Sequence, residues 1–144
     1  MSQVLATPAP TPTRRQRLVA PAWTIGGLAV ATLALRLRDP HEHGSWGICP
    51  SAAMGVWCPG CGGLRAVNDL SHGHPLDAAS SNLAFVVALP FILLGLTVWV
   101  VNRWRGTRLD VSPRVVKAFT VGALTALAVF TVLRNLPAGA WLAP

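Results

Sequence analysis

Three long stretches without a charged residue place the strongest constraint on what this chain can fold into. They cover residues 19–35, 83–101 and 118–133. As a helix, the first stretch spans about 26 Å, near the lower limit for crossing the hydrocarbon core of a bilayer. Only 12% of the residues are charged, about half the usual share in soluble domains. The pattern predicts an all-α integral membrane protein with three transmembrane helices, at about residues 19–35, 83–101 and 116–133.

The residues around these stretches predict the domain organisation. Residues 1–17 contain alternating prolines followed by arginines, which is typical of a disordered basic tail. No small-residue cleavage site follows the first apolar stretch, so we favour a tail over a secretory signal. Residues 18–144 then form one three-helix membrane domain. Pro90 should bend the second helix or mark its packing against a neighbour. Ser112 before Pro113 should cap the third helix.

The distribution of positive charge predicts the orientation of the helices. Three crossings put residues 1–17 and the connection after residue 101 on one side, with eight arginines and lysines. The connection of residues 36–81 and the C-terminus share the other side, with four. By the positive-inside rule, the N-terminus lies in the cytoplasm and residues 36–81 lie outside, where disulfides persist. This rule explains the net charge of +7, so we expect the lipid bilayer and no nucleic acid as a partner.

The connection of residues 36–81 holds every cysteine and histidine of the chain. Its centre, Cys58-Pro59-Gly60-Cys61-Gly62-Gly63, is rich in residues that break helices and form turns. A structureless connection of this length is unusual, so we expect a short amphipathic helix at about Gly63–Ser71 and a helix start near Pro75. The N-terminus of the first of these helices should favour a thiolate at Cys61.

The three cysteines are open to three interpretations. Disulfides between Cys49, Cys58 and Cys61 can staple the loop, with at least one thiol left unpaired because the number is odd. Cys58 and Cys61 at a helix start also have the spacing of a thiol–disulfide exchange site. Finally, Cys58 and Cys61 with His72 and His74 offer two thiolates and two imidazoles to zinc, or soft thiolates to copper.

Other chemistry has little support in the sequence. Gly62 stands where c-type haem attachment requires a histidine. Neither a Ser–His–acid pattern nor paired carboxylates nor a phosphate-binding loop occurs, so we expect no catalytic residue and no enzyme activity. Arg65 either binds an anionic partner or covers a helix surface. Asn82 either forms hydrogen bonds between helices or caps the second transmembrane helix.

The cysteine motif resembles a family of small bacterial membrane proteins of unknown function, marked by Cys-Pro-x-Cys-Gly and a nearby arginine. The resemblance extends over about residues 49–105, while Leu64 and His74 depart from the family pattern. The matching residues are Cys58, Pro59, Cys61, Gly62, Arg65, Ala66, Leu70, Gly73, Ala78 and Asn82. The arginine-rich, three-helix build also resembles small accessory factors of the actinobacterial cytochrome bcc–oxidase supercomplex.

These resemblances imply a multi-pass protein of the bacterial cell membrane. We expect a non-catalytic accessory subunit of a larger membrane complex, with the respiratory supercomplex as the named candidate. Small residues four apart in the apolar stretches suit close helix contacts with such a partner. The alternative is a membrane thiol–disulfide oxidoreductase or metal-handling protein that uses the loop of Cys58 and Cys61.

Overall fold

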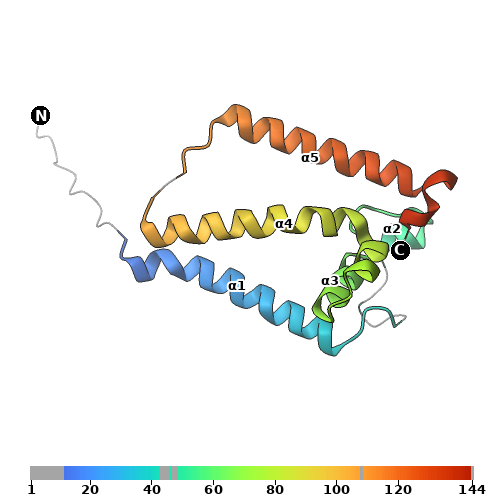
Figure 1. Ribbon diagram of the computed structural model, residues 1–144, viewed down its shortest axis with the longest axis horizontal. Helices are drawn as coiled ribbons and strands as arrows, with labels where there is room; N and C mark the ends of the chain where they lie inside the picture. The colour runs from blue at the N-terminus through green and yellow to red at the C-terminus, as the bar shows by residue number, and fades with distance from the viewer. Residues whose placement is uncertain (1–11, 43–45, 47–48, 108, 144) are drawn as a thin grey trace, which may run out of the picture.

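The computed structural model describes residues 12–42, 46, 49–107 and 109–143, and within these ranges it is helical without a strand. Figure 1 shows three long helices running alongside one another, with shorter elements gathered at one end. The elements are α1 (Arg14–Leu37), α2 (Pro50–Ala53), α3 (Gly63–Ser71), α4 (Pro75–Arg105), α5 (Pro113–Arg134) and the 3-10 helix η1 (Pro137–Leu142). Helices α1, α4 and α5 are long and apolar enough to cross a membrane. The predicted all-α fold with three transmembrane helices is confirmed.

Helix α1 begins at Arg14, inside the segment expected to be a disordered tail through residue 17. A capping box explains the earlier start. The Thr13 hydroxyl accepts a hydrogen bond from the Gln16 backbone N–H, and the Thr13 N–H donates to the Gln16 side chain at 2.9 Å. These two bonds satisfy donors that a helix N-terminus otherwise leaves unpaired. The remainder of the expected tail, residues 1–11, lies outside the described residues.

Helix α4 consists of a short helix and a membrane span joined at Asn82. The backbone of Asn82 has φ −159° and ψ 93°, outside helical geometry. The Asn82 side-chain oxygen accepts a hydrogen bond from the Phe85 N–H at 2.9 Å, as an N-cap does. The chain therefore breaks at Asn82. Pro90, where the sequence predicted a bend or a packing contact, lies inside the helix and is not a non-helical position. The predicted helix start near Pro75 is confirmed.

Helix α5 begins as predicted, with Ser112 as its N-cap and Pro113 at its first position. Its other end is tied to the cysteine loop. The Asn135 side chain accepts a hydrogen bond from the Trp57 N–H and donates one to the Trp57 carbonyl, both at 2.8 Å. Because this pair of bonds joins residues far apart in the sequence, it fixes the loop against the end of the third span.

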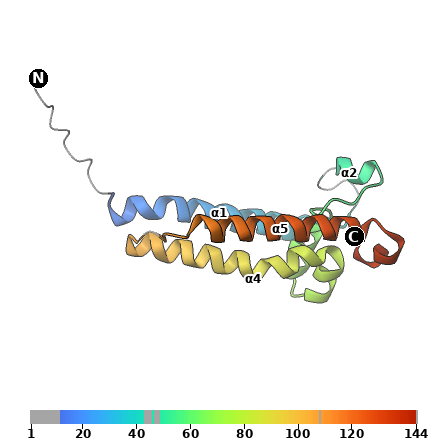
Figure 2. The same ribbon diagram turned by 90° about the horizontal axis from the view of Figure 1, so that it is seen from above.

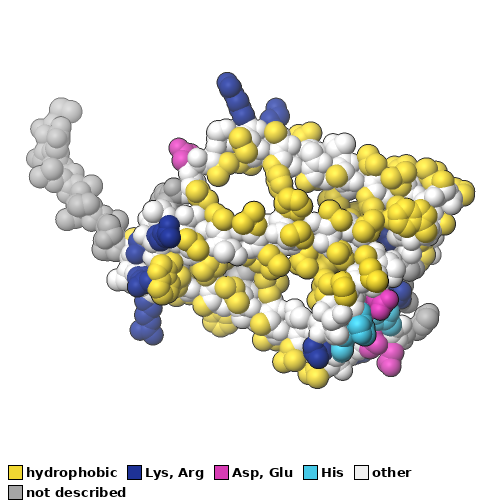
Figure 3. All heavy atoms as spheres, viewed as in Figure 1, with side chains coloured by type: hydrophobic (Ala, Val, Ile, Leu, Met, Phe, Trp, Pro, Cys, Tyr) yellow, Lys and Arg dark blue, Asp and Glu magenta, His cyan; other side chains and the backbone are white. Residues whose placement is uncertain are grey.

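The buried core lies at the loop end of the molecule, where α3 packs on α4 and the end of α1. Ala66 of α3 and Ala78 of α4 are fully buried, and their small side chains let the two helices approach closely. The Asn68 side chain donates to the Leu35 carbonyl at 2.7 Å, joining α3 to α1. Hydrophobic side chains cover much of the visible surface of the long helices, whereas the histidines and most of the visible carboxylates gather near the loop end (Figure 3). Figure 2 shows that α2, α3 and η1 all lie at this end.

Candidate metal centre

Three sulfur atoms meet in the loop between α1 and α4. Cys61 Sγ lies 3.1 Å from Cys58 Sγ and 3.4 Å from Cys49 Sγ. All three sulfur atoms lie within 4.8 Å of one another. The cysteines are free thiols, since a disulfide would require about 2.05 Å. The Ser51 hydroxyl borders the cluster, 3.1 Å from Cys49 Sγ and 3.7 Å from Cys61 Sγ.

A tight turn positions Cys58 and Cys61. The Cys61 N–H donates to the Cys58 carbonyl at 3.1 Å, and the Gly63 N–H donates to the Gly60 carbonyl at 2.9 Å. Gly62 has φ 80°, in the left-handed region that glycine occupies without strain. Helix α3 starts directly after this glycine, so the turn and the helix start are one continuous unit, with the predicted bounds Gly63–Ser71.

Two buried side chains hold the carbonyl groups of this turn. Asn82 is 1% exposed and donates to the Pro59 and Cys61 carbonyls at 2.9 and 3.0 Å. Arg134, also 1% exposed, donates through Nη1 to the Cys58 and Cys61 carbonyls at 2.9 and 3.3 Å. Asn82 thus fulfils both roles considered from the sequence, as a helix cap and as a hydrogen-bond donor between elements.

The three thiols differ in acidity because their surroundings differ. Hydrogen bonding from the Ser51 hydroxyl lowers the pKa of Cys49 to about 6. Hydrogen bonding with Cys61 lowers the pKa of Cys58. Burial raises the pKa of Cys61 to about 11, and its hydrogen bonds to the other two sulfurs act in the same direction. The sequence predicted that the helix start would favour a thiolate at Cys61, but here desolvation outweighs that effect.

The structure does not bring His72 and His74 to the sulfur atoms. The Nδ1 atom of His72 lies 3.0 Å from the Asn68 carbonyl oxygen. The Nδ1 atom of His74 lies 3.8 Å from Asp77 Oδ2. Nine residues of α3 separate the cysteine turn from His72, a rise of about 13 Å. Among the described residues, the cluster of possible ligands is therefore the three cysteines, and not the predicted pair of cysteines with two histidines.

Two side chains of α3, Arg65 and Asp69, contact the segment that follows α1. Arg65 donates through Nε to the Pro40 carbonyl at 3.4 Å, so it ties α3 to the segment after α1. His41 lies between two carboxylates, with Nδ1 2.7 Å from Asp39 Oδ1 and Nε2 3.4 Å from Asp69 Oδ1. The members of this group come from separate segments, so no sequence pattern marks them as a group.

Residues 49–96 match the model of a family described as a protein of unknown function (DUF2752). The matched segment begins at Cys49 and includes the other two cysteines and Asn82, whereas Arg134 lies beyond it. Searches of curated proteins and of solved structures found no match for the chain. The match thus coincides with the cysteine centre without supplying an activity for it.

Proposed function

We propose that this protein is a membrane metal-handling protein that binds a thiophilic ion through Cys49, Cys58 and Cys61. The observation that carries the proposal is the meeting of three sulfur atoms, from two segments of the loop, within 4.8 Å of one another. In a tetrahedral site with metal–sulfur bonds of 2.3 Å, the sulfur atoms stand about 3.8 Å apart. The cluster reaches this geometry with small side-chain adjustments.

The number of ligands favours a transferable ion over a structural one. Structural zinc sites use four protein ligands, whereas sites with three keep a position open for water or an incoming group. The described part of the chain offers three sulfur ligands at the cluster. Cys49 and Cys58 are half-buried, so the ion remains accessible for exchange. Soft thiolates suit zinc and monovalent copper.

The positive-inside rule supports placing this centre on the outer face of the cell membrane, with the N-terminus in the cytoplasm. The test is labelling of intact cells with a membrane-impermeant maleimide after mild reduction and metal chelation. Labelling of Cys49 before lysis supports the proposed orientation. Labelling only after lysis contradicts it.

The metal-binding test uses the full chain, purified in detergent without air from cells grown with ordinary trace metals. Mass spectrometry should find one thiophilic ion per chain, and X-ray absorption should find three sulfur neighbours at about 2.3 Å. Replacing any one cysteine by serine should remove most of the ion. His72→Ala is the matched control, because His72 lies outside the cluster, and it should retain the ion.

Three outcomes of the metal-binding test would contradict or change the proposal. Metal-free protein with free thiols would refute the proposal. Loss of the ion in the His72 variant would restore the ligand set expected from the sequence. A native disulfide at Cys61, which lies close to both other sulfurs, would instead favour thiol–disulfide exchange.

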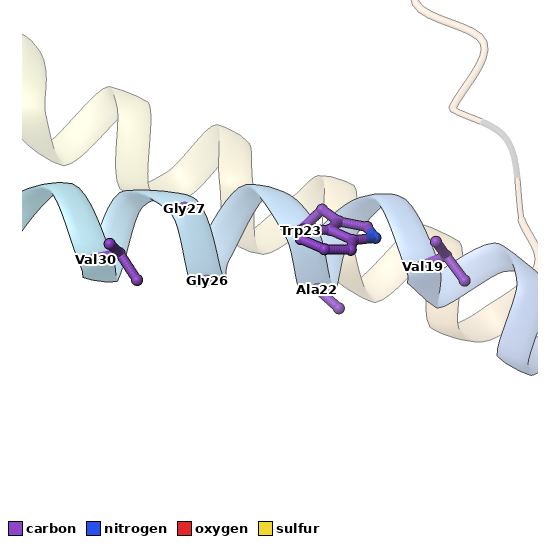
Figure 4. A pocket seen from close by; sticks show the side chains of 6 residues that line it. All are labelled: Val19, Ala22, Trp23, Gly26, Gly27 and Val30. Atoms are coloured by element: carbon purple, nitrogen blue, oxygen red, sulfur yellow. The ribbon is translucent and has the colours of Figure 1, made fainter.

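A second candidate function is that of an accessory subunit, and a hollow on α1 favours it. Gly26 and Gly27 leave a gap in the side-chain surface beside Trp23 and Val30 (Figure 4). A Cβ added at either glycine would meet nothing within 4 Å, so a helix of a larger membrane subunit can approach the backbone closely. The resemblance noted above makes the respiratory cytochrome supercomplex the named partner.

Gentle purification from the native membrane tests this second function. Stoichiometric large subunits, lost in a Gly26→Leu variant, would support it. A chain that always purifies alone would contradict it.

A further inference from the structure

Among the residues that the structure describes, Arg134 is a buried charge without a carboxylate partner. It stands at the end of α5, 1% exposed, with its guanidinium 4.9 Å from the centre of the Phe130 ring. Its Nη1 atom donates to the cysteine turn, but Nε and Nη2 are buried without a hydrogen-bond partner in the part of the chain that the structure describes. The ion pairs of these described residues involve His41 and His74, and none involves Arg134. A buried, uncompensated charge is strongly destabilising.

Within the described ranges, the acidic groups that interact electrostatically with this guanidinium are the thiols of Cys61 and Cys58. The contact is built into the turn, because Arg134 holds the carbonyl groups of these same two residues. When the thiols are neutral, the described residues offer no negative charge to balance Arg134. When a metal ion replaces the thiol protons, a negative charge forms beside it.

The charge count favours a divalent ion if all three thiolates bind it. Three thiolates carry −3, a divalent ion brings the complex to −1, and Arg134 brings the assembly to zero. A monovalent ion on three thiolates brings the assembly, with Arg134 included, to −1. An uncompensated charge is costly beside the buried Cys61, Asn82 and Arg134.

We propose that Arg134 is the built-in counter-charge of the three-cysteine centre, and that the centre takes a divalent ion of the zinc class on all three thiolates. This inference rests on the proposed metal-binding function and names its ion. A monovalent copper ion reaches the same neutral total on two thiolates, so it should leave one cysteine unused.

The test measures the affinities of the purified full chain for Zn²⁺ alone and Cu⁺ alone, by competition with chelators of known strength without air. Arg134→Gln keeps an amide donor for the turn but removes the charge. It should lower zinc affinity at least tenfold. If the guanidinium and the ion complex are assumed to lie roughly 8 Å apart in an effective dielectric of about 20, the lost attraction between them changes the affinity by that factor or more. Arg134→Lys keeps the charge and should stay within about threefold of the wild type on the same grounds. Cys49→Ser should weaken zinc far more than copper.

The matched control separates charge from loop structure. Asn135→Ala removes the neighbouring clamp on Trp57 without a change of charge, and its zinc affinity should stay close to that of the wild type. Equal zinc affinity in the wild type and Arg134→Gln would overturn the inference, as would an equal loss in the Gln and Lys variants. A wild-type chain that binds neither ion would instead refute the proposed function itself.

Discussion

Replacing Asn82 by alanine should loosen the joint between the cysteine turn and the second membrane span. The side chain makes three hydrogen bonds from a position that is 1% exposed. One bond caps the span through the Phe85 N–H. The other two hold the Pro59 and Cys61 carbonyls. Alanine fills none of these roles, and water has little access to replace them.

The structure sets the magnitude of this loss. Losing the cap costs about 1 kcal/mol. The Pro59 carbonyl loses its bond to Asn82, which costs about 1 kcal/mol or more for a partly buried group. The Cys61 carbonyl keeps the bond from Arg134, so its loss is smaller, about 0.5–1 kcal/mol. Together the free energy of unfolding should fall by about 3 kcal/mol.

The assay is denaturant unfolding of the purified chain in a mild detergent, followed by circular dichroism. Asn82→Ser keeps an oxygen for the cap and should lose about 2 kcal/mol, from the two carbonyl bonds alone. Asn102→Ala is the matched control on the same helix. The Asn102 side chain accepts one exposed bond from Thr107, so this variant should stay within about 0.5 kcal/mol of the wild type. If Asn82→Ala were as stable as Asn102→Ala, Asn82 would not hold this joint.

Two further predictions concern the backbone clearance at Gly139 and the acidity of the cysteines. Gly139→Ala should destabilise the chain by more than about 1 kcal/mol in the same assay, because its Cβ would clash with the Leu133 backbone. Gly122→Ala, where the Cβ meets nothing within 4 Å, should have no such effect. In reduced, metal-free protein, iodoacetamide should modify Cys49 fastest at neutral pH, with a rate that rises through about pH 6 as its thiolate forms. Cys61 should react only as the pH approaches about 11, and similar rates for both at pH 7, read by peptide mass spectrometry, would contradict these assignments.

The helices were predictable because their signals are local. Uncharged stretches long enough to cross a bilayer mark the three spans. Ser112 before Pro113 marks a helix start, and the glycines before Leu64 mark the start of α3. The predicted start of α1 was too late, but the missed signal was also local, since Thr13 and Gln16 have the spacing of a capping box.

The candidate centre was only partly predictable because distant residues complete it. The spacing of Cys58 and Cys61 marks them as a possible ligand pair, but Cys49 has no motif that links it to them as a ligand. His72 and His74 lie near the cysteines in the sequence, yet a rigid helix separates them in space. Arg134 reads as an ordinary positive residue at the end of a membrane helix, where arginine usually extends to the interface. It is buried because the loop folds over it.

The centre therefore depends on the arrangement of the spans, and the spans depend on the centre. Asn82 of α4 and Arg134 of α5 both donate to the carbonyl of Cys61, and the Cys61 sulfur lies close to both other sulfurs. Drawing the three sulfurs onto one ion fixes Cys61, and with it the carbonyl that joins the two helices. Binding that stabilises one arrangement of α4 and α5 must be weakened by any force that separates them, because such coupling is reciprocal. A membrane partner that moves α5 at the loop end would thereby alter the affinity of the proposed centre for an ion.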